Sequence, residues 1–266
     1  MAEHSASDTR TTAENRAIVT RANLDAAVGD AARKQAFVTP LFDLIAPRYD
    51  RFTRVFSFGM DARWKEELVQ WLLQDFEHAR APHILDVACG TGDLAIASAL
   101  ALPTAHVTGV DVSKRMLERA RRRLTPLLDE RVTFVHGDLT RLALESESVE
   151  AVTAGYAVRN VPDSRQALGE LARVLRRGGR VYLLDFFRPS HTRWRKFFLG
   201  YLRVAGSAVG WWWHRTPAAY EYIAASIAAF VSQEEFARWL EATGFTVERT
   251  RPRLGGGVGL ISARKR

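Results

Sequence analysis

The stretch ILDVACGTGDL, residues 84–94, decides the fold expected for this chain of 266 residues. It has the pattern of a buried strand, a tight turn with Gly90 and Gly92, and the start of a helix, whose first backbone N–H groups lack partners within the helix. In an open α/β sheet, ligands bind in the crevice at the carboxyl ends of the strands. A dinucleotide fingerprint would need a third glycine where Ala95 stands, and the acidic Asp93 disfavours a pyrophosphate. The stretch therefore predicts an α/β protein that binds a ligand other than a dinucleotide.

On both sides of this stretch, short apolar runs alternate with helical patterns of about 10 to 15 residues, which is typical of βαβ units and a parallel sheet. The sequence predicts strands at residues 84–88, 107–112, 132–135, 149–154, 180–187, 245–251 and 259–263. It predicts helices at residues 94–102, 113–124, 164–177 and 232–243. We therefore expect a seven-stranded, mostly parallel sheet.

The remaining segments divide the chain further. Residues 1–34 contain no aromatic residue and are expected to form a flexible tail, disordered or loosely helical, because they offer too little apolar surface to bury. Residues 35–80 carry apolar side chains at helical spacing and predict an N-terminal helical cap. The main domain then covers residues 81–266, and residues 189–231, which belong to no βαβ unit, predict a helical insertion after the fifth strand that acts as a substrate lid.

Composition limits the partners. The net charge of +8 suits a polyanion, but the 38 basic residues are spread along the chain, so we expect no nucleic-acid partner. The only cysteine is Cys89, and the N-terminus does not resemble a secretory signal, so we expect a cytoplasmic protein. No apolar run reaches the roughly 18 residues that a spanning helix needs. Association with the inner face of a membrane remains open.

Three carboxylates lie at predicted strand ends. Asp86 precedes the glycine turn, Asp111 ends the second predicted strand, and Asp138 follows the third. A carboxylate at the position of Asp111 can accept both hydroxyls of a ribose, and one at Asp138 can meet an adenine amino group. Together with the turn they indicate an adenosine ligand without phosphates, which is S-adenosylmethionine. No cluster of metal-ligating residues stands out, so we expect no metal.

Several motifs resemble those of the ubiquinone/menaquinone biosynthesis C-methyltransferases, a family that methylates a ring carbon of demethylmenaquinone or of a polyprenyl-benzoquinol. The resemblance covers about residues 42–245. Its carriers, besides the glycine turn, are FxxIAxxYD at 42–50, SFG at 57–59, WK at 64–65, RNV at 159–161, GG at 178–179 and YxYIxxSIxxF at 220–230. The resemblance implies a Rossmann-like class I S-adenosylmethionine methyltransferase.

The resemblance also implies which residues bind the cofactor. The expected set, including the residues of the turn itself, is Asp86, Gly90, Thr91, Gly92, Asp111, Asp138, Leu139 and Gly155. Three features depart from the family: Gly155 stands where serine is frequent, Val231 where proline is usual, and three tryptophans at 211–213 have no counterpart. These departures leave open another hydrophobic or phenolic acceptor, and the high charge leaves an RNA methyltransferase or a non-catalytic adenosine-binding module as alternatives.

Methylation of an aromatic ring carbon requires that an adjacent hydroxyl lose its proton, so the site must stabilise a phenolate. We expect Arg159 of the RNV motif to supply electrostatic stabilisation, because its guanidinium is too basic to accept a proton. Tyr49 and Asp50 are the next catalytic candidates, either as a lid over the cofactor or as a proton acceptor. The predicted acceptor is a lipophilic quinol, demethylmenaquinol or a polyprenyl-benzoquinol.

Residues 191–213 form a predicted amphipathic helix with Arg193, Lys196 and Arg203 on its basic face. The predicted apolar face contains Trp194, Phe198, Tyr201, Leu202, Ala205, Val209 and Trp212. Such a helix can rest at a lipid interface as a peripheral membrane contact. It can equally pack on the protein core or on a second subunit, which leaves a homodimer open.

Overall fold

The fold is organised around one sheet, seen in the computed structural model, which describes residues 12–49, 53–54, 57, 59–213 and 217–266. The strand order is β3-β2-β1-β4-β5-β7-β6, with β1 to β5 parallel and β7 antiparallel to both of its neighbours. The strands are β1 His83–Val87, β2 His106–Asp111, β3 Val132–His136, β4 Val149–Gly155, β5 Leu175–Phe186, β6 Phe245–Arg253 and β7 Val258–Lys265. The prediction of a seven-stranded, mostly parallel sheet is confirmed.

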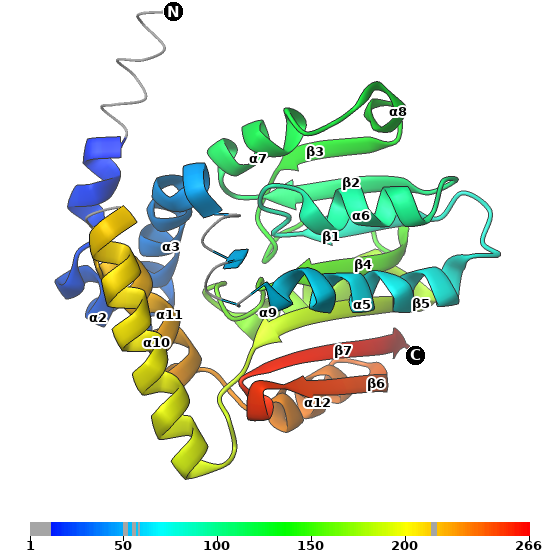
Figure 1. Ribbon diagram of the computed structural model, residues 1–266. Coiled ribbons are helices and arrows are strands. Elements are labelled where there is room, and N and C mark those ends of the chain that lie inside the picture. Colours follow the sequence, from blue (N-terminus) through cyan, green and yellow to red (C-terminus); the bar gives the residue numbers. More distant parts are fainter. Residues whose placement is uncertain (1–11, 50–52, 55–56, 58, 214–216) are drawn as a thin grey trace, which may run out of the picture.

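Helices cover both faces of the sheet, and further helices lie beyond one end of it (Figure 1). Those on the faces are α5 Met60–Phe76, α6 Asp93–Ala101, α7 Lys114–Arg121, α9 Ser164–Val174 and α12 Gln233–Ala242, and the short α8 Pro126–Asp129 precedes β3. Those at the end are α2 Arg21–Gly29, α3 Ala31–Ile45, α10 Thr192–Trp213 and α11 Pro217–Ala229. The described residues also form a helix at 12–18 and two 3₁₀ turns, η1 Ala46–Arg48 and η2 Leu254–Gly256.

The central strands are apolar on both sides because both faces of the sheet are covered. In β1, Ile84 joins the core beneath α5 and α6, whereas Leu85 and Val87 point the other way into the core beneath α9 and α12. This alternation follows from the two-residue repeat of a strand. It leaves Asp86 on the α6 side, fully buried, where the chain turns toward the predicted ligand site.

The end of α9 differs from the predicted helix 164–177. The helix stops at Val174, and β5 begins at once, with Leu175 paired to Val149. Gly178 has φ +78°, and a Cβ at Gly179 would lie 2.8 Å from the Glu150 carbonyl oxygen. The two glycines therefore form an irregularity within β5 rather than a helix terminus, which the sequence pattern alone does not distinguish.

The N-terminal segment is packed on the rest of the fold more closely than the disordered or loosely helical tail expected over residues 1–34. Where the structure describes it, from residue 12, the chain forms helices, and Thr20 and Asp30 cap the N-termini of α2 and α3. Its buried apolar side chains share one cluster with α3 and α11; those before α3 are Val19, Leu24 and Ala27. These few residues fold because α11, about 200 positions later in the chain, supplies the apolar surface that they lack.

Helices α10 and α11 occupy the chain between β5 and α12, at the same end of the sheet as α2 and α3 (Figure 1). Phe198 and Leu202 of α10 are buried against Ala224 and Ile227 of α11. Side chains at 207–213, including the predicted lipid-facing Val209 and Trp212, lie outside the described residues. Over the described residues, none of the helices combines the length and the apolar character required to cross a membrane.

Candidate active site

Two adjoining pockets open at the carboxyl ends of β1, β2 and β4, which is the position that the fold predicts for a ligand. The larger pocket measures about 670 Å³ and the smaller about 340 Å³, including the solvent at their mouths. Residues from the cap and from the sheet line both, namely Tyr49, Ala88, Gly90, Gly155 and Tyr156. The two pockets therefore form one continuous site, and α3 lines the larger of them.

The glycine turn lies where the two pockets meet. Gly90 has φ +55° and Gly92 has φ +84°, conformations that L side chains rarely adopt. A Cβ on Gly92 would lie 2.7 Å from the ring of Phe134, so this glycine permits close packing against β3 and does not line either pocket. Of the two, only Gly90 presents its backbone to a ligand.

Asp111 lies at the end of β2 in the wall of the larger pocket. Its two oxygens accept hydrogen bonds from the Gly90 and Ser113 N–H groups, each at 2.8 Å. These bonds fix the carboxylate and leave each oxygen a further lone pair for a hydroxyl. Asp138 and Leu139 line the same pocket, and Thr140 donates two hydrogen bonds to Asp138 Oδ1, both at 2.7 Å. The carboxylates predicted for ribose and adenine are thus brought to one cavity.

Asp86 lines the smaller pocket and is 1% exposed. Thr153 Oγ1 donates to its Oδ1 at 2.7 Å, and the Ala95 N–H donates to its Oδ2 at 3.0 Å. Burial raises the pKa of Asp86 to about 7, against the opposing effect of these two donors. Asp86 therefore titrates close to neutral pH, and a nearby cation would favour its ionised form.

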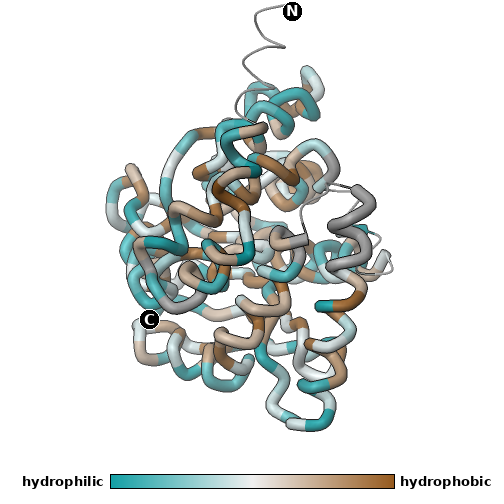
Figure 2. The backbone as a smooth tube through the Cα atoms, turned by 90° about the vertical axis from the view of Figure 1, so that its left-hand side faces the viewer, coloured by the Kyte–Doolittle hydropathy of each residue, from teal (hydrophilic) through white to brown (hydrophobic). Residues whose placement is uncertain are grey.

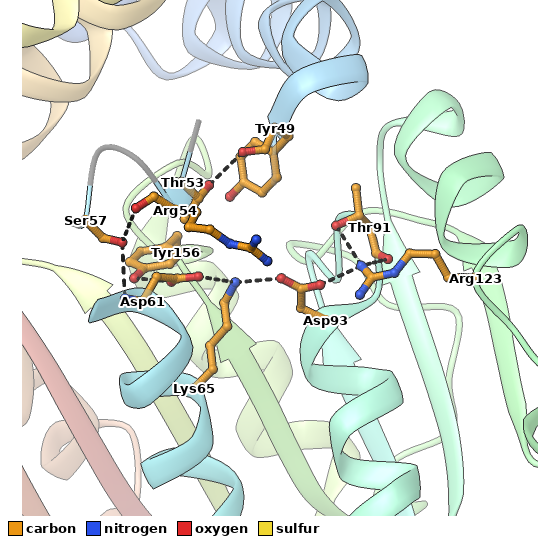
Figure 3. Close-up of polar contacts among 10 residues, drawn as sticks. All are labelled: Tyr49, Thr53, Arg54, Ser57, Asp61, Lys65, Thr91, Asp93, Arg123 and Tyr156. Carbon is orange, nitrogen blue, oxygen red and sulfur yellow. Dashed lines mark hydrogen bonds and ion pairs between the residues drawn. The ribbon is translucent and has the colours of Figure 1, made fainter. Parts of the chain in front are cut away.

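A charged cluster borders the smaller pocket (Figure 3). Lys65 of α5 reaches between two carboxylates, with its Nζ 2.7 Å from Asp61 Oδ2 and 2.8 Å from Asp93 Oδ2. Arg123 Nη1 lies 2.5 Å from Asp93 Oδ1 and donates to the Thr91 carbonyl oxygen at 2.8 Å. The predicted ligand residue Thr91 is thereby held on the pocket wall by a cation.

The predicted catalytic residues occupy different positions. Tyr49 lines both pockets, and burial raises its pKa to about 12, so its phenol is protonated at neutral pH. Asp50 lies outside the described residues. Arg159 lies behind the wall that Asn160 and Val161 form and does not line either pocket. Electrostatic stabilisation by Arg159 stays a prediction.

Arg159 is buried in a network that joins three elements. Its Nε lies 3.5 Å from Asp185 Oδ1 at the end of β5, and its Nη1 donates to Asn160 Oδ1 at 3.1 Å. Nη1 also donates a hydrogen bond to Ser226 Oγ of α11. Lys34 of α3 donates to the Arg159 carbonyl oxygen at 2.8 Å. These contacts tie the cap and α11 to the pocket wall.

The interpretation of the sequence missed several residues of the site. Lys65 was noted as part of the WK motif, but no role was predicted for it. Asp61 and Tyr156 were not considered. The apolar lining contributed by α3 and α7, Val38, Phe42 and Met116, was also missed. The motifs could have indicated Lys65. Its partners could not be inferred, because Asp93 is 28 positions away in the chain.

The residues present fit S-adenosylmethionine. Asp111 offers paired acceptors to a ribose, and the ionised form of Asp86 complements a sulfonium. At Gly155 a Cβ would come within 3.0 Å of Leu94, so glycine keeps that wall open. Fold and site together define an S-adenosylmethionine-dependent methyltransferase of the Rossmann-like class.

Comparisons with known proteins identify the methyltransferase family to which the chain belongs. The model of the ubiE/COQ5 methyltransferase family matches residues 30–263, and the chain belongs to this family. It is 39% identical to the ubiquinone/menaquinone biosynthesis C-methyltransferase UbiE of Syntrophotalea carbinolica, over 84% of this chain and 92% of that protein. It is 36% identical to the demethylmenaquinone methyltransferase of Clavibacter sepedonicus, over 87% and 91%.

Solved structures agree on the fold. A SAM-dependent methyltransferase from Thermotoga maritima superposes with a TM-score of 0.57 at 19% identity, over 86% of this chain and 100% of that one. The YcgJ protein from Bacillus subtilis gives a TM-score of 0.56 at 20% identity, over 76% and 99%. At such identities the likeness concerns the fold alone.

Proposed function

We propose that this enzyme transfers a methyl group from S-adenosylmethionine to a ring carbon of a lipophilic quinol, demethylmenaquinol or a polyprenyl-benzoquinol, in quinone biosynthesis. The observation that carries the proposal is the extent of the family match. It covers residues 30–263 and so includes α3, α10 and α11 as well as the cofactor turn. The match therefore extends to the helices beyond the end of the sheet as well as to the cofactor turn.

The larger pocket contains Asp111 and Asp138, which suit the nucleoside, and its walls on the side of α3 are apolar, which supports a hydrophobic acceptor beside the cofactor. When bound, S-adenosylmethionine supplies a methyl group activated by the positive sulfonium. Apolar side chains from α3, α7 and the loop after β4 line the pocket: Val38, Phe42, Met116 and Val161. In such a setting the ring of a quinol can lie beside the cofactor site.

We assign Tyr49 to closing the site. Because its pKa of about 12 keeps the phenol protonated, it can donate a hydrogen bond but is a poor proton acceptor at neutral pH. Arg159 acts as a positioning residue, since it joins Asn160 in the pocket wall to Ser226 on α11. Tyr49 belongs to the cap, and Arg159 contacts α11. Through these two residues the shape of the larger pocket depends on the cap and on α11.

Peripheral membrane contact through α10 is part of this proposal. Phe198 and Leu202 of the predicted apolar face are buried, as the core alternative expects, whereas Phe197, Tyr201 and Val204 are 65%, 36% and 74% exposed. Their spacing of four and three residues sets them on one face. Figure 2 views the side of the molecule on which α10 and α2 lie. The exposed cations Arg193, Lys196 and Arg203 adjoin this stripe and suit an anionic membrane that contains the acceptor.

The proposal is tested by lipid extracts from a strain that lacks this gene. We expect mass spectrometry to find a quinone without one ring methyl group, and the wild-type gene to restore the methylated quinone. An unchanged quinone pool, with another phenolic compound lacking a methyl group, would point to the alternative acceptor.

A further inference from the structure

The smaller pocket is lined by Lys65 and Asp93, and Asp61 pairs with Lys65 next to the pocket. The fold does not explain the role of this charged cluster of Asp61, Lys65 and Asp93. The Lys65 side chain is 14% exposed and the Asp61 side chain 10%, so the ions are largely removed from water. Tyr156 OH donates to Asp61 Oδ1 at 2.7 Å and completes the shell of that carboxylate. Buried ion pairs cost desolvation energy and are weak contributors to stability. Their position at a ligand pocket therefore points to recognition.

Lys65 and Asp93 stabilise each other's charged form. Burial alone would lower the pKa of Lys65, but the carboxylates of Asp93 and Asp61 outweigh it and raise that pKa. Burial alone would raise the pKa of Asp93, but Lys65 and Arg123 outweigh it and lower that pKa. The pocket wall thus presents the cation of Lys65 and the anion of Asp93 side by side.

The arrangement of the two pockets indicates which part of a ligand lies against the charged cluster. The larger pocket contains Asp111 and Asp138, which suit the ribose and the adenine. The smaller pocket joins it at Gly90 and Gly155, with Asp86 in its wall. A ligand whose nucleoside occupies the larger pocket must therefore extend its other end toward Lys65. In S-adenosylmethionine that end is an α-amino acid, which has one carboxylate and one ammonium.

We propose that the cluster of Asp61, Lys65 and Asp93 binds the amino-acid end of S-adenosylmethionine. Lys65 pairs with the α-carboxylate, and Asp93, assisted by Asp61, attracts the α-ammonium. Arg123 holds Asp93 in place through its other oxygen. The inference rests on the cofactor and is independent of the quinol acceptor.

The test measures binding by calorimetry, without an acceptor. The probes are S-adenosylhomocysteine, which has the amino-acid end, and 5′-methylthioadenosine, which lacks it. In Lys65→Met we expect affinity for S-adenosylhomocysteine to fall about 10- to 100-fold, as for the loss of a hydrogen bond to a charged group. Affinity for 5′-methylthioadenosine should be unchanged. An equal loss for both probes, or a loss for neither, would overturn the proposal.

Two controls keep the test decisive. Arg63→Met removes an exposed cation from the same helix and should leave both affinities at the wild-type value. If Lys65→Met does not fold, the wild-type protein is tested with decarboxylated S-adenosylmethionine, which lacks only the α-carboxylate. We expect it to bind at least tenfold more weakly than S-adenosylmethionine. Equal binding of these two ligands would contradict the role of Lys65.

Discussion

At the scale of single residues, Asp86 links cofactor binding to pH. Its pKa of about 7 means that it is mostly protonated below neutral pH. A sulfonium beside it favours the ionised form, so binding of S-adenosylmethionine below pH 7 releases a proton. S-adenosylhomocysteine has a neutral sulfur, so its binding does not favour the ionised form of Asp86.

We therefore expect the affinity ratio of S-adenosylmethionine to S-adenosylhomocysteine to rise with pH, by at most about tenfold per unit, and to level off above about pH 7. Calorimetry across this range checks the slope. In Asp86→Asn the ratio should be independent of pH, and a slope that persists in this variant would assign it to another group.

Arg159 is the second residue whose role can be measured. Lysine keeps the charge but loses the planar fork that contacts Asp185, Asn160 and Ser226. We expect Arg159→Lys to lower the free energy of unfolding by about 1 to 3 kcal/mol and to lower kcat, with unchanged affinity for S-adenosylhomocysteine.

The pH profile of kcat separates the two roles of Arg159. A positioning residue predicts a defect that is the same at high and neutral pH, whereas stabilisation of a phenolate predicts rescue at high pH. Arg63→Lys, at an exposed arginine on α5, is the matched control and should change neither quantity appreciably. An Arg159→Lys variant with wild-type stability would refute the positioning role.

The sequence identifies residues that act within one short motif better than residues that act across elements. Asp111 and Asp138 follow strands, and parallel strands bring their ends together, so both could be predicted from their positions. Lys65 approaches Asp93 only because α5 and α6 pack side by side. That packing depends on the tertiary fold and leaves no periodic signal in the sequence.

At the scale of elements, α10 shows that a helical pattern does not decide which of its apolar side chains are buried. Apolar residues occupy two neighbouring stripes, one with Phe198 and Leu202 and one with Phe197, Tyr201 and Val204. The pattern predicts an amphipathic helix, and only the position of α11 decides which stripe is buried. The exposed stripe is the one left for a membrane.

We expect the protein to float with vesicles that contain anionic lipid and to be released by salt, because salt screens the attraction of its basic residues. Replacing Phe197, Tyr201 and Val204 together by Ser should reduce flotation, as should replacing Arg193, Lys196 and Arg203 together by Glu. Leu100 and Leu127 are 58% and 73% exposed elsewhere on the molecule, and their replacement by Ser should have no effect. If the α10 variants float like the wild type, this helix has no membrane role.

At the scale of the whole molecule, the sheet could be predicted from the sequence but the cap could not be predicted in full. The strands could be predicted because they consist of short apolar runs, which are buried on both faces of the sheet. The segment before α3 has only scattered apolar residues, and its partner Tyr222 lies on α11, far along the chain. Helix α11 packs on α3, which lines the larger pocket, so the shape of that pocket depends on the assembled fold.

The most direct measurement is methyl transfer by the purified protein from S-adenosylmethionine with a labelled methyl group. Demethylmenaquinol and a polyprenyl-benzoquinol are supplied in vesicles, and the products are analysed by mass spectrometry and NMR. The account predicts that the label appears on a ring carbon of at least one quinol. Absence of label from both quinols, or label on a hydroxyl oxygen, would contradict C-methylation of a lipophilic quinol.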